Sequence, residues 1–131
     1  MERIVIPPYD SYGVARLVVH GDLVVTGHFG GQAAADGTPQ VGISAQAREA
    51  FAHLARALQA AGLRLGDVMK VTVILRDIVD FDAMHAVWAD VFPHNPPART
   101  TITSDFVDAA CLIQVEAIAA RREEPARPRL V

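Results

Sequence analysis

Residues 61–81 read AGLRLGDVMKVTVILRDIVDF, and the middle of this stretch decides the fold. Val68–Leu75 is almost continuously hydrophobic and rich in β-branched residues, a pattern typical of a strand covered on both faces. Gly62 can end a helix before this strand, and Asp80 can cap a second helix after it. The stretch therefore predicts a central strand that connects two helices.

Apolar residues that recur at intervals of three and four predict the two helices. The first helix begins at Ser44. Its apolar stripe consists of Ala47, Phe51, Leu54, Leu58 and Ala61. The stripe of the second helix consists of Phe81, Met84, Trp88 and Val91. Three prolines between residues 93 and 97 end the second helix, and the proline-rich loop leads directly to Arg99.

Upstream of the helices, the sequence indicates a hairpin and a long loop. Residues 15–19 and 23–26 are short β-prone runs, and the His-Gly-Asp turn at 20–22 joins them. Residues 28–42 have the Gly/Ala/Pro-rich composition of an irregular loop. The sequence at the end of this loop, residues 40–43, is compatible with one more short strand.

Two β-prone runs complete the chain, residues 99–103 and 112–119, and we expect these strands to pair with each other. The order of elements predicts one domain over residues 1–120, of the α/β (α+β) class. It should have a mixed β-sheet with two helices on one face. The segment 121–131, RREEPARPRLV, mixes charge with two prolines and is expected to be a flexible tail.

Composition excludes several classes of partner. The formal net charge is −3, and no Lys/Arg cluster follows a helix face, so we expect no nucleic acid partner. No apolar run approaches the roughly 20 residues of a membrane span, so we expect no membrane partner. Cys111 is the single cysteine and the N-terminus lacks signal-peptide features, which favours a cytoplasmic protein.

Metal and cofactor motifs are absent from the sequence. The five histidines are scattered, with no i, i+4 pair and no cysteine or carboxylate at metal-ligand spacing. No phosphate-binding glycine motif occurs, and Cys111 has no histidine partner in the sequence that would make it a nucleophile. We therefore expect no metal and no cofactor, and Cys111 to be a small buried hydrophobic residue.

Four segments in order resemble the RidA/YjgF family up to about Ala120. They are GDLVVTGHFG from Gly21, AGLRLGDVMKVTVILRDIVDF from Ala61, PPARTTI from Pro96 and VEAIA from Val115. The resemblance implies a chorismate-mutase-like fold that assembles as a homotrimer, with the sheets lining a central barrel and clefts between subunits. It also implies hydrolysis of reactive 2-imino acids to 2-oxo acids and ammonia.

Burial independently favours association of copies, in line with the homotrimer that the resemblance implies. Two helices can cover only one face of the sheet, so the other face of the Val68–Leu75 strand would be left in water unless copies associate. The alternative is a monomer whose second face is screened by the Gly-rich loop.

The resemblance assigns Arg99 to substrate binding. The tetrapeptide at 97–100, PART, matches the P-A-R-[ST] motif, whose arginine holds the substrate carboxylate in that family. A planar guanidinium suits this role because it can donate two parallel hydrogen bonds to a carboxylate. The alternative is a solvated arginine at a sheet edge.

Further pocket residues come from weaker matches. Thr26 and Gly27 begin a Thr-Gly-His segment that resembles the Ser-Gly-Gln of the family, where glycine permits close approach of a ligand and the hydroxyl can donate a hydrogen bond. Residues 12–15, Tyr-Gly-Val-Ala, resemble the family's Tyr-Ser-Gln-Ala more loosely, which makes Tyr12 a further candidate. The backbone of Thr101 would help to frame the ligand. A plain strand end is the alternative at Thr26, and His85 is assigned no role.

Gln114 separates two functional hypotheses. In the active deaminases of the family, E-x-E-A-I-A carries a first glutamate that positions the attacking water, and here that position is Gln114. A carboxamide can orient water but cannot accept its proton. Glu116 lies on the same side of the strand but two residues away.

The leading hypothesis is therefore imine hydrolysis, with Arg99 holding the carboxylate and Gln114 the water. The alternative is a non-catalytic trimeric module that binds or senses a small carboxylate. A third is a hydrolase or isomerase for another small carbonyl acid or an enamine, which keeps Arg99 and has a changed wall at residues 106–111.

Overall fold

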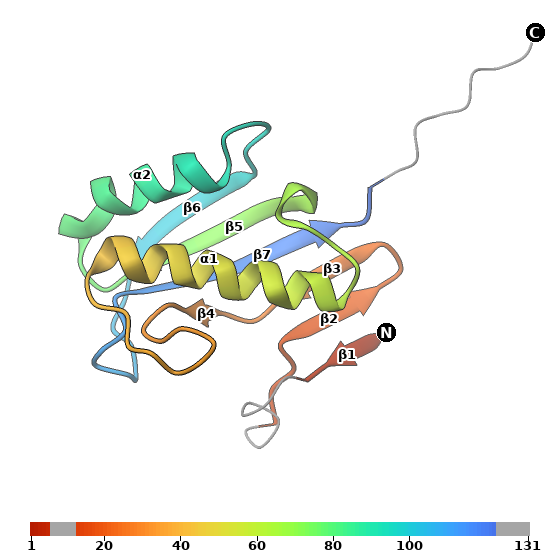
Figure 1. The fold of residues 1–131 in the computed structure, drawn as a ribbon. Coiled ribbons are helices and arrows are strands. Elements are labelled where there is room, and N and C mark those ends of the chain that lie inside the picture. The colour runs from red at the N-terminus through yellow and green to blue at the C-terminus, as the bar shows by residue number, and fades with distance from the viewer. Residues whose placement is uncertain (6–12, 123–131) are drawn as a thin grey trace, which may run out of the picture.

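The computed structural model describes residues 1–5 and 13–122. The strands are β1 (Glu2–Ile4), β2 (Leu17–His20), β3 (Leu23–Thr26), β4 (Phe29–Gly30), β5 (Val68–Leu75), β6 (Ala98–Thr103) and β7 (Ile113–Ala120). The helices are α1 (Ile43–Ala60) and α2 (Phe81–Val91), with short 3-10 turns η2 (Leu65–Asp67) and η3 (Ile78–Asp80). The chain forms one mixed sheet, and Figure 1 shows both helices on the same face of it, as predicted.

The central strand has the predicted bounds but is enclosed on one face only. The sheet order is β1-β2-β3-β7-β5-β6, with β4 beside β7, so β5 lies inside the sheet. Val71, Val73 and Leu75 are fully buried beneath the helices. Thr72 and Ile74, which alternate with them, are only partly covered. We call the face away from the helices the open face.

The predicted pairing of the last two strands is wrong. β6 pairs with β5 in parallel, and Arg99 lies beside Val71. β7 pairs with the other edge of β5 in antiparallel orientation, so that Ala117 lies beside Val71 as well. The reason is that a strand, a crossover helix and a second strand close as a parallel pair, which places β6 directly beside β5. β6 thereby becomes an edge strand.

The first helix is buried along its predicted stripe. Ala47, Phe51, Leu54 and Leu58 are almost completely inaccessible. The helix begins at Ile43, after Gly42 with φ 87°, so the short strand considered for residues 40–43 is not formed. Gly62 follows the helix with φ 75°, the left-handed conformation expected of a helix-ending glycine.

The second helix packs on the first through aromatic rings. Phe51 of α1 meets Trp88 and Phe92 edge-on, with ring centroids 5.9 and 5.7 Å apart. Asp80 does precede α2, but its side chain makes no capping hydrogen bond. Instead, the Asp77 carboxylate accepts a hydrogen bond of 3.0 Å from the Val79 N–H, which closes the turn before the helix.

The hairpin of β2 and β3 is formed as predicted, with Gly21 in the turn at φ 59°. β1, which the sequence analysis missed, extends the sheet beyond β2. The following loop contains β4 and then runs close to α1. A side chain at Gly31 would overlap the Gln46 carbonyl, so this close approach requires glycine.

Two polar side chains, buried Gln46 and partly buried Arg76, hold the connection from β6 to β7. The Gln46 amide donates to the Ala110 carbonyl at 2.8 Å and accepts from the Leu112 N–H at 2.8 Å. Arg76 donates to the Cys111 carbonyl at 2.8 Å and to the Asp108 carbonyl at 2.7 Å. These contacts fix the start of β7, and hence the position of Gln114.

The described chain continues two residues beyond β7, into the predicted tail. The Arg121 N–H donates to the Asp22 carbonyl at 2.8 Å, and the Arg122 side chain pairs with Asp67 at 2.9 Å. The remainder of the predicted tail, 123–131, lies outside the described residues. Among the described residues, neither helix has the length and hydrophobicity needed to cross a membrane.

Candidate functional site

Arg99 lies on β6 beneath α2, on the helix face of the sheet. It pairs in register with buried Val71, so the two side chains point to the same side. Its guanidinium carbon is 4.7 Å from the centroid of the Trp88 ring and 5.6 Å from that of Phe81. Such stacking restrains the guanidinium plane while its N–H edge stays able to donate.

The charge of Arg99 is not neutralised within the described part of the chain. The ion pairs among the described residues connect other side chains, and none of them brings a carboxylate to Arg99. Partial burial lowers the pKa of the Arg99 guanidinium, which stays protonated because arginine ionises far above neutral pH. A restrained cation without an internal acid is suited to an anionic ligand.

His85, to which the sequence analysis assigns no role, contacts the candidate site residue Arg99. Its Nδ1 lies 3.0 Å from Nη1 of Arg99, and its ring stacks parallel to Phe81 with centroids 6.0 Å apart. Because an arginine nitrogen can only donate, Nδ1 is the acceptor in this contact. The i, i+4 spacing of Phe81 and His85 was the available signal, but only the β5–α2–β6 packing brings Arg99 beneath them.

Thr101 follows Arg99 on the same face of β6, beside buried Val73. β6 ends the strand order of the described sheet, so one of its edges carries no neighbouring strand. Backbone groups along such an edge can bond to a ligand or to another chain. The expectation that the Thr101 backbone frames a ligand stays a prediction.

Gln114 lies on the opposite face of the sheet from Arg99. Along β7, Ile113, Val115, Ala117 and Ala119 are buried under the helices. Gln114 and Glu116 alternate with them and therefore face the open side. Since β5 also separates β6 from β7, a single chain does not bring Arg99 and Gln114 together.

The Thr26 hydroxyl is already engaged inside the sheet. It accepts a hydrogen bond of 2.9 Å from the Ala117 N–H and donates one of 2.7 Å to the Gly27 carbonyl. The hydroxyl bridges β3 and β7 where their main-chain pairing stops after Val25 and Ile118. The expected donation to a ligand therefore competes with a structural hydrogen bond.

Gly27 has room for a side chain among the described residues. A Cβ there would meet only the Ala15 carbonyl oxygen of this part of the chain, at an ordinary 3.7 Å. The packing of the described residues therefore does not demand glycine, and close approach of a ligand remains the predicted reason for it. Tyr12, the other weak candidate, lies outside the described residues.

Cys111 is completely buried, as predicted. Burial raises the pKa of its thiol, which donates to the Ile113 carbonyl at 3.2 Å. A protonated, enclosed thiol is a poor nucleophile. Among residues 1–5 and 13–122, no three His, Cys, Asp or Glu side chains gather in a way that could hold a metal ion.

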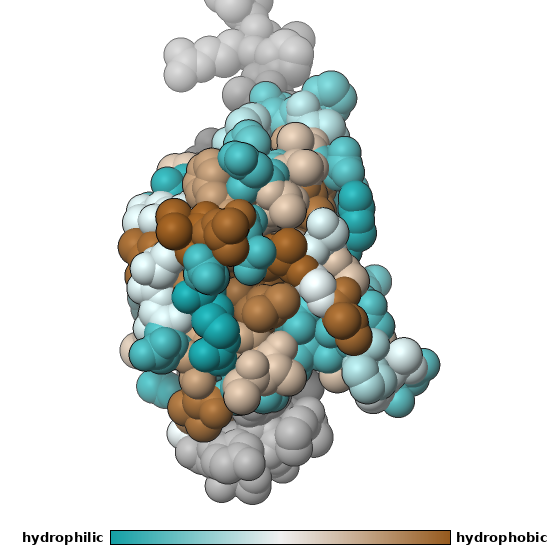
Figure 2. Space-filling model, turned by 90° about the vertical axis from the view of Figure 1, so that its left-hand side faces the viewer, coloured by the Kyte–Doolittle hydropathy of each residue, from teal (hydrophilic) through white to brown (hydrophobic). Residues whose placement is uncertain are grey.

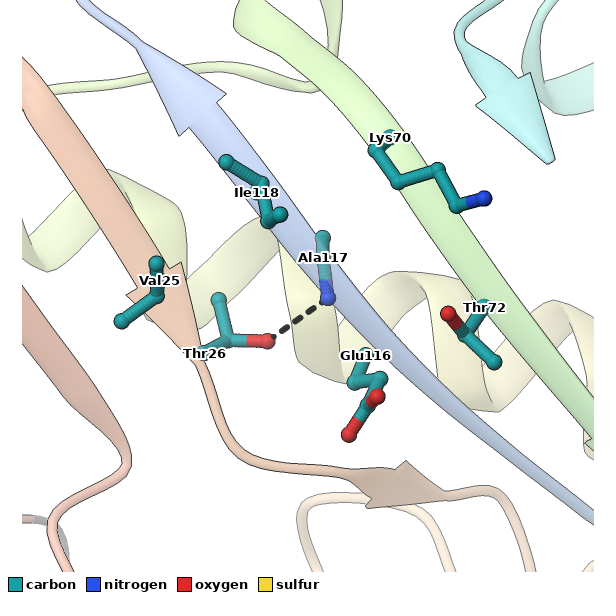
Figure 3. Close-up of a pocket in the computed structure, with 7 residues that line it drawn as sticks. All are labelled: Val25, Thr26, Lys70, Thr72, Glu116, Ala117 and Ile118. Carbon is teal, nitrogen blue, oxygen red and sulfur yellow. Dashed lines mark hydrogen bonds between the residues drawn. The ribbon is translucent and has the colours of Figure 1, made fainter. Parts of the chain in front are cut away.

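The open face carries a shallow pocket of about 240 Å³. Figure 3 shows Lys70 and Thr72 of β5 and Glu116 of β7 around it, with the Thr26–Ala117 hydrogen bond at one side. Lys70 donates to the Thr100 hydroxyl at 2.6 Å. Neither Arg99 nor Gln114 lines this pocket, so it is separate from the arginine site.

Sequence comparison relates the chain to deaminases. A family model described as endoribonuclease L-PSP matches residues 5–121. A RutC family protein from Pyrococcus horikoshii is 40% identical over 77 residues, which cover 59% of this chain and 61% of that protein. A 2-iminobutanoate/2-iminopropanoate deaminase from Salmonella typhimurium is 37% identical over 83 residues, 61% of this chain and 65% of the enzyme. The chain thus spans less than two thirds of the length of these two curated relatives.

Longer but more distant matches extend the likeness. The human 2-iminobutanoate/2-iminopropanoate deaminase is 27% identical over 114 residues, 87% of this chain and 80% of the enzyme. A crystal structure of a YjgF/YER057c/UK114 family member from Mycobacterium tuberculosis superposes with a TM-score of 0.82 at 24% identity. The superposition covers 92% of this chain and 98% of the other, so the two share a fold.

Proposed function

The chain belongs to the RidA/YjgF family, whose family model is described as endoribonuclease L-PSP, and from this premise we propose that it hydrolyses small 2-imino acids to 2-oxo acids and ammonia. The observation that carries the proposal is Arg99, a cation stacked on Trp88 with no acid partner among the described residues. A 2-imino acid offers the planar carboxylate that such a guanidinium binds through two parallel hydrogen bonds.

We further propose that the site is completed between two copies of the chain in a homotrimer. Arg99 and Gln114 lie on opposite faces of one sheet, so a site that uses both needs a second copy. The open face also carries exposed apolar side chains that water would otherwise cover. They are Leu23, Val25, Ile102 and Ile118, each 38–47% exposed.

In this arrangement, Arg99 and the Thr101 backbone of one copy hold the carboxylate at the free edge of β6. Gly27 and Gln114 of the neighbouring copy approach the imine carbon, and the Gln114 carboxamide orients a water molecule toward it. Fixing both reactants in this geometry removes much of the entropic barrier to attack. The substrate itself is reactive, so orientation alone accelerates hydrolysis.

Gln114 also favours a second candidate function, a trimeric module that binds or senses a small carboxylate without turning it over. Such a module keeps the Arg99 clamp and needs no base. Loss of a general base typically costs about 10²–10⁴ in rate. The two functions therefore differ in turnover and agree in ligand binding.

One experiment separates them. An amino acid oxidase generates 2-iminopropanoate or 2-iminobutanoate in situ, and the disappearance of the imine is followed with wild type, Arg99→Ala and Gln114→Glu. The proposal expects wild type to exceed the enzyme-free blank and Arg99→Ala to match it. Arg48→Ala, which changes an exposed arginine of α1, is the control and should behave as wild type.

A wild type that matches the blank while 2-oxo acids still raise its melting temperature would reject the hydrolase and favour the binding module. If neither turnover nor stabilisation is found, both functions are rejected.

A further inference from the structure

His28 lies just before β4, across from Gln114 and Glu116 of β7. These two residues of the open face are the ones beside the proposed water. β4 pairs with β7 so that Phe29 is opposite Val115 and Gly30 is opposite Gln114. One step back along this antiparallel pair, His28 falls opposite Glu116. It is therefore the diagonal neighbour of Gln114.

The three side chains share one face of the sheet. Phe29 and Val115 are buried on the helix face. Since side chains alternate along a strand, His28, Gln114 and Glu116 point to the open face. Diagonal neighbours on one face lie about 7–8 Å apart at Cα. This separation is spanned by an imidazole, one water molecule and a carboxamide.

The surroundings of His28 keep its imidazole neutral at neutral pH. Partial burial lowers the pKa of His28, the positive charge of Arg16 lowers it further, and the negative charge of Glu116 opposes both. Arg16 precedes β2 and Glu116 belongs to β7. These two are the charged groups acting on the imidazole from the described elements that pack around it.

A neutral imidazole has a ring nitrogen that can accept a proton. The hydrogen bonds of histidine rings among the described residues belong to His53 and His85. The His28 ring is thus uncommitted within this part of the chain, and it remains exposed on the open face.

We propose that His28 is the general base of the reaction, a catalytic residue that accepts the proton which Gln114 cannot. Gln114 orients the water through its carbonyl oxygen, and the ring of His28 removes a proton as the water oxygen attacks. The inference rests on the proposed imine hydrolysis and names the group that makes it effective despite the carboxamide.

Water is the co-reactant, and protons and electrons balance without an oxidant or reductant. The water oxygen forms a bond to C2 of the protonated imine, the C=N π electrons move to nitrogen, and a water proton moves to His28. The imidazolium then returns this proton to the amine. The C2–N bond breaks, and the released ammonia takes up the hydroxyl proton, which gives the 2-oxo acid and ammonium.

The test compares His28→Gln with wild type in the in situ imine assay. His28→Gln should lower kcat by about 10² or more and change KM little, because Arg99 is untouched. His20→Gln, a matched change in the exposed residue that ends β2, is the control. Binding of a 2-oxo acid to His28→Gln, measured by melting temperature, verifies that the site is intact.

A second readout is the pH profile of kcat. Wild type should lose kcat on acidification as an imidazole is protonated. His28→Gln combined with Gln114→Glu should regain turnover, with its acid limb at lower pH, since a carboxylate ionises below an imidazole.

Turnover by His28→Gln equal to that of wild type, or a wild-type kcat that does not fall on acidification, would overturn the role of His28 and leave the hydrolase function standing. A wild type without turnover overturns both. Loss of turnover in His28→Gln, together with its recovery when Gln114→Glu is added, supports the inference.

Discussion

At the scale of single residues, the contact between Arg99 and His85 connects an exposed histidine of α2 to the proposed ligand site. His85 accepts a hydrogen bond of 3.0 Å from the Arg99 guanidinium, and the Trp88 ring stacks against the plane of that guanidinium. Both come from α2, whereas Arg99 comes from β6. The orientation of the cation therefore depends on a helix that is not proposed to bind the carboxylate itself.

Replacing Arg99 by lysine should weaken ligand binding although the charge is kept. Lysine cannot donate two parallel hydrogen bonds, and a hydrogen bond between charged groups contributes about 1.5–3 kcal/mol. We expect the dissociation constant of a 2-oxo acid, measured by calorimetry, to rise by about 10-fold to 100-fold. Equal affinity would mean that Arg99 acts as a point charge only.

His85→Ala should raise KM and leave kcat within a few-fold, because His85 positions Arg99 and does not touch the reacting atoms. His85→Asn is the matched variant, since its Oδ1 can replace the Nδ1 acceptor. Steady-state kinetics should show recovery of KM in His85→Asn. If both variants have the same KM, the hydrogen bond to Arg99 has no role in orienting it.

His28 also makes the stability of the fold depend on acid. Its pKa in the folded chain lies below the ordinary value of 6.5, so below that pH the unfolded chain binds more protons and stability falls. Urea unfolding of wild type should thus show a loss of stability as the pH falls below about 7. His28→Gln should lose less stability on the same acidification, and an equal loss would place the acid sensitivity elsewhere.

At the scale of elements, two glycines of the loop after β3 have different reasons to be glycine. Gly31 lets the chain pass against α1, where a Cβ would overlap the Gln46 carbonyl, whereas Gly27 has space for one. Position 31 is therefore a packing constraint. Position 27 is open for the ligand approach that the family resemblance predicts.

Gly31→Ala should lower the free energy of unfolding by about 1–3 kcal/mol or more, because the added methyl must displace backbone. Gly27→Ala should leave that free energy nearly unchanged and weaken 2-oxo acid binding. Chemical denaturation and calorimetry on the two variants test both halves. A destabilised Gly27→Ala would show that this glycine, too, is structural.

At the scale of the whole molecule, apolar surface remains on two sides of the single chain. The open face carries Val25 and Ile118. Ile78, Val79 and Val107, in the connections that follow β5 and β6, are exposed as well. Figure 2, which views the molecule from the left-hand side of Figure 1, shows apolar residues gathered among hydrophilic ones.

Placing a charge on the open face should dissociate the proposed trimer. Val25→Asp would bury a carboxylate between the sheets, which is costly without a partner. Light scattering should give a trimeric mass for wild type and a smaller mass for Val25→Asp. Val41→Asp, at an 87% exposed position before α1, is the control and should remain trimeric. A monomeric wild type would rule out the site between copies.

The sequence by itself determined both helices, the longer strands and the family. The helix stripes, the hairpin and the bounds of β5 are local patterns, because periodicity of 3.6 or 2 residues is set by the backbone of each element. The motif around Arg99 and the carboxamide at Gln114 were likewise visible in the sequence. β1 and β4 were missed because runs of three and two residues carry no measurable period.

Only the tertiary structure decided how these elements meet. The pairing of β6 with β5, the opposite faces of Arg99 and Gln114, and the contact with His85 depend on long-range strand order. The same holds for Thr26, whose hydroxyl is occupied by a strand distant in sequence. Alternation fixes faces within one strand, but relative faces and neighbours arise only when the strands assemble into a sheet.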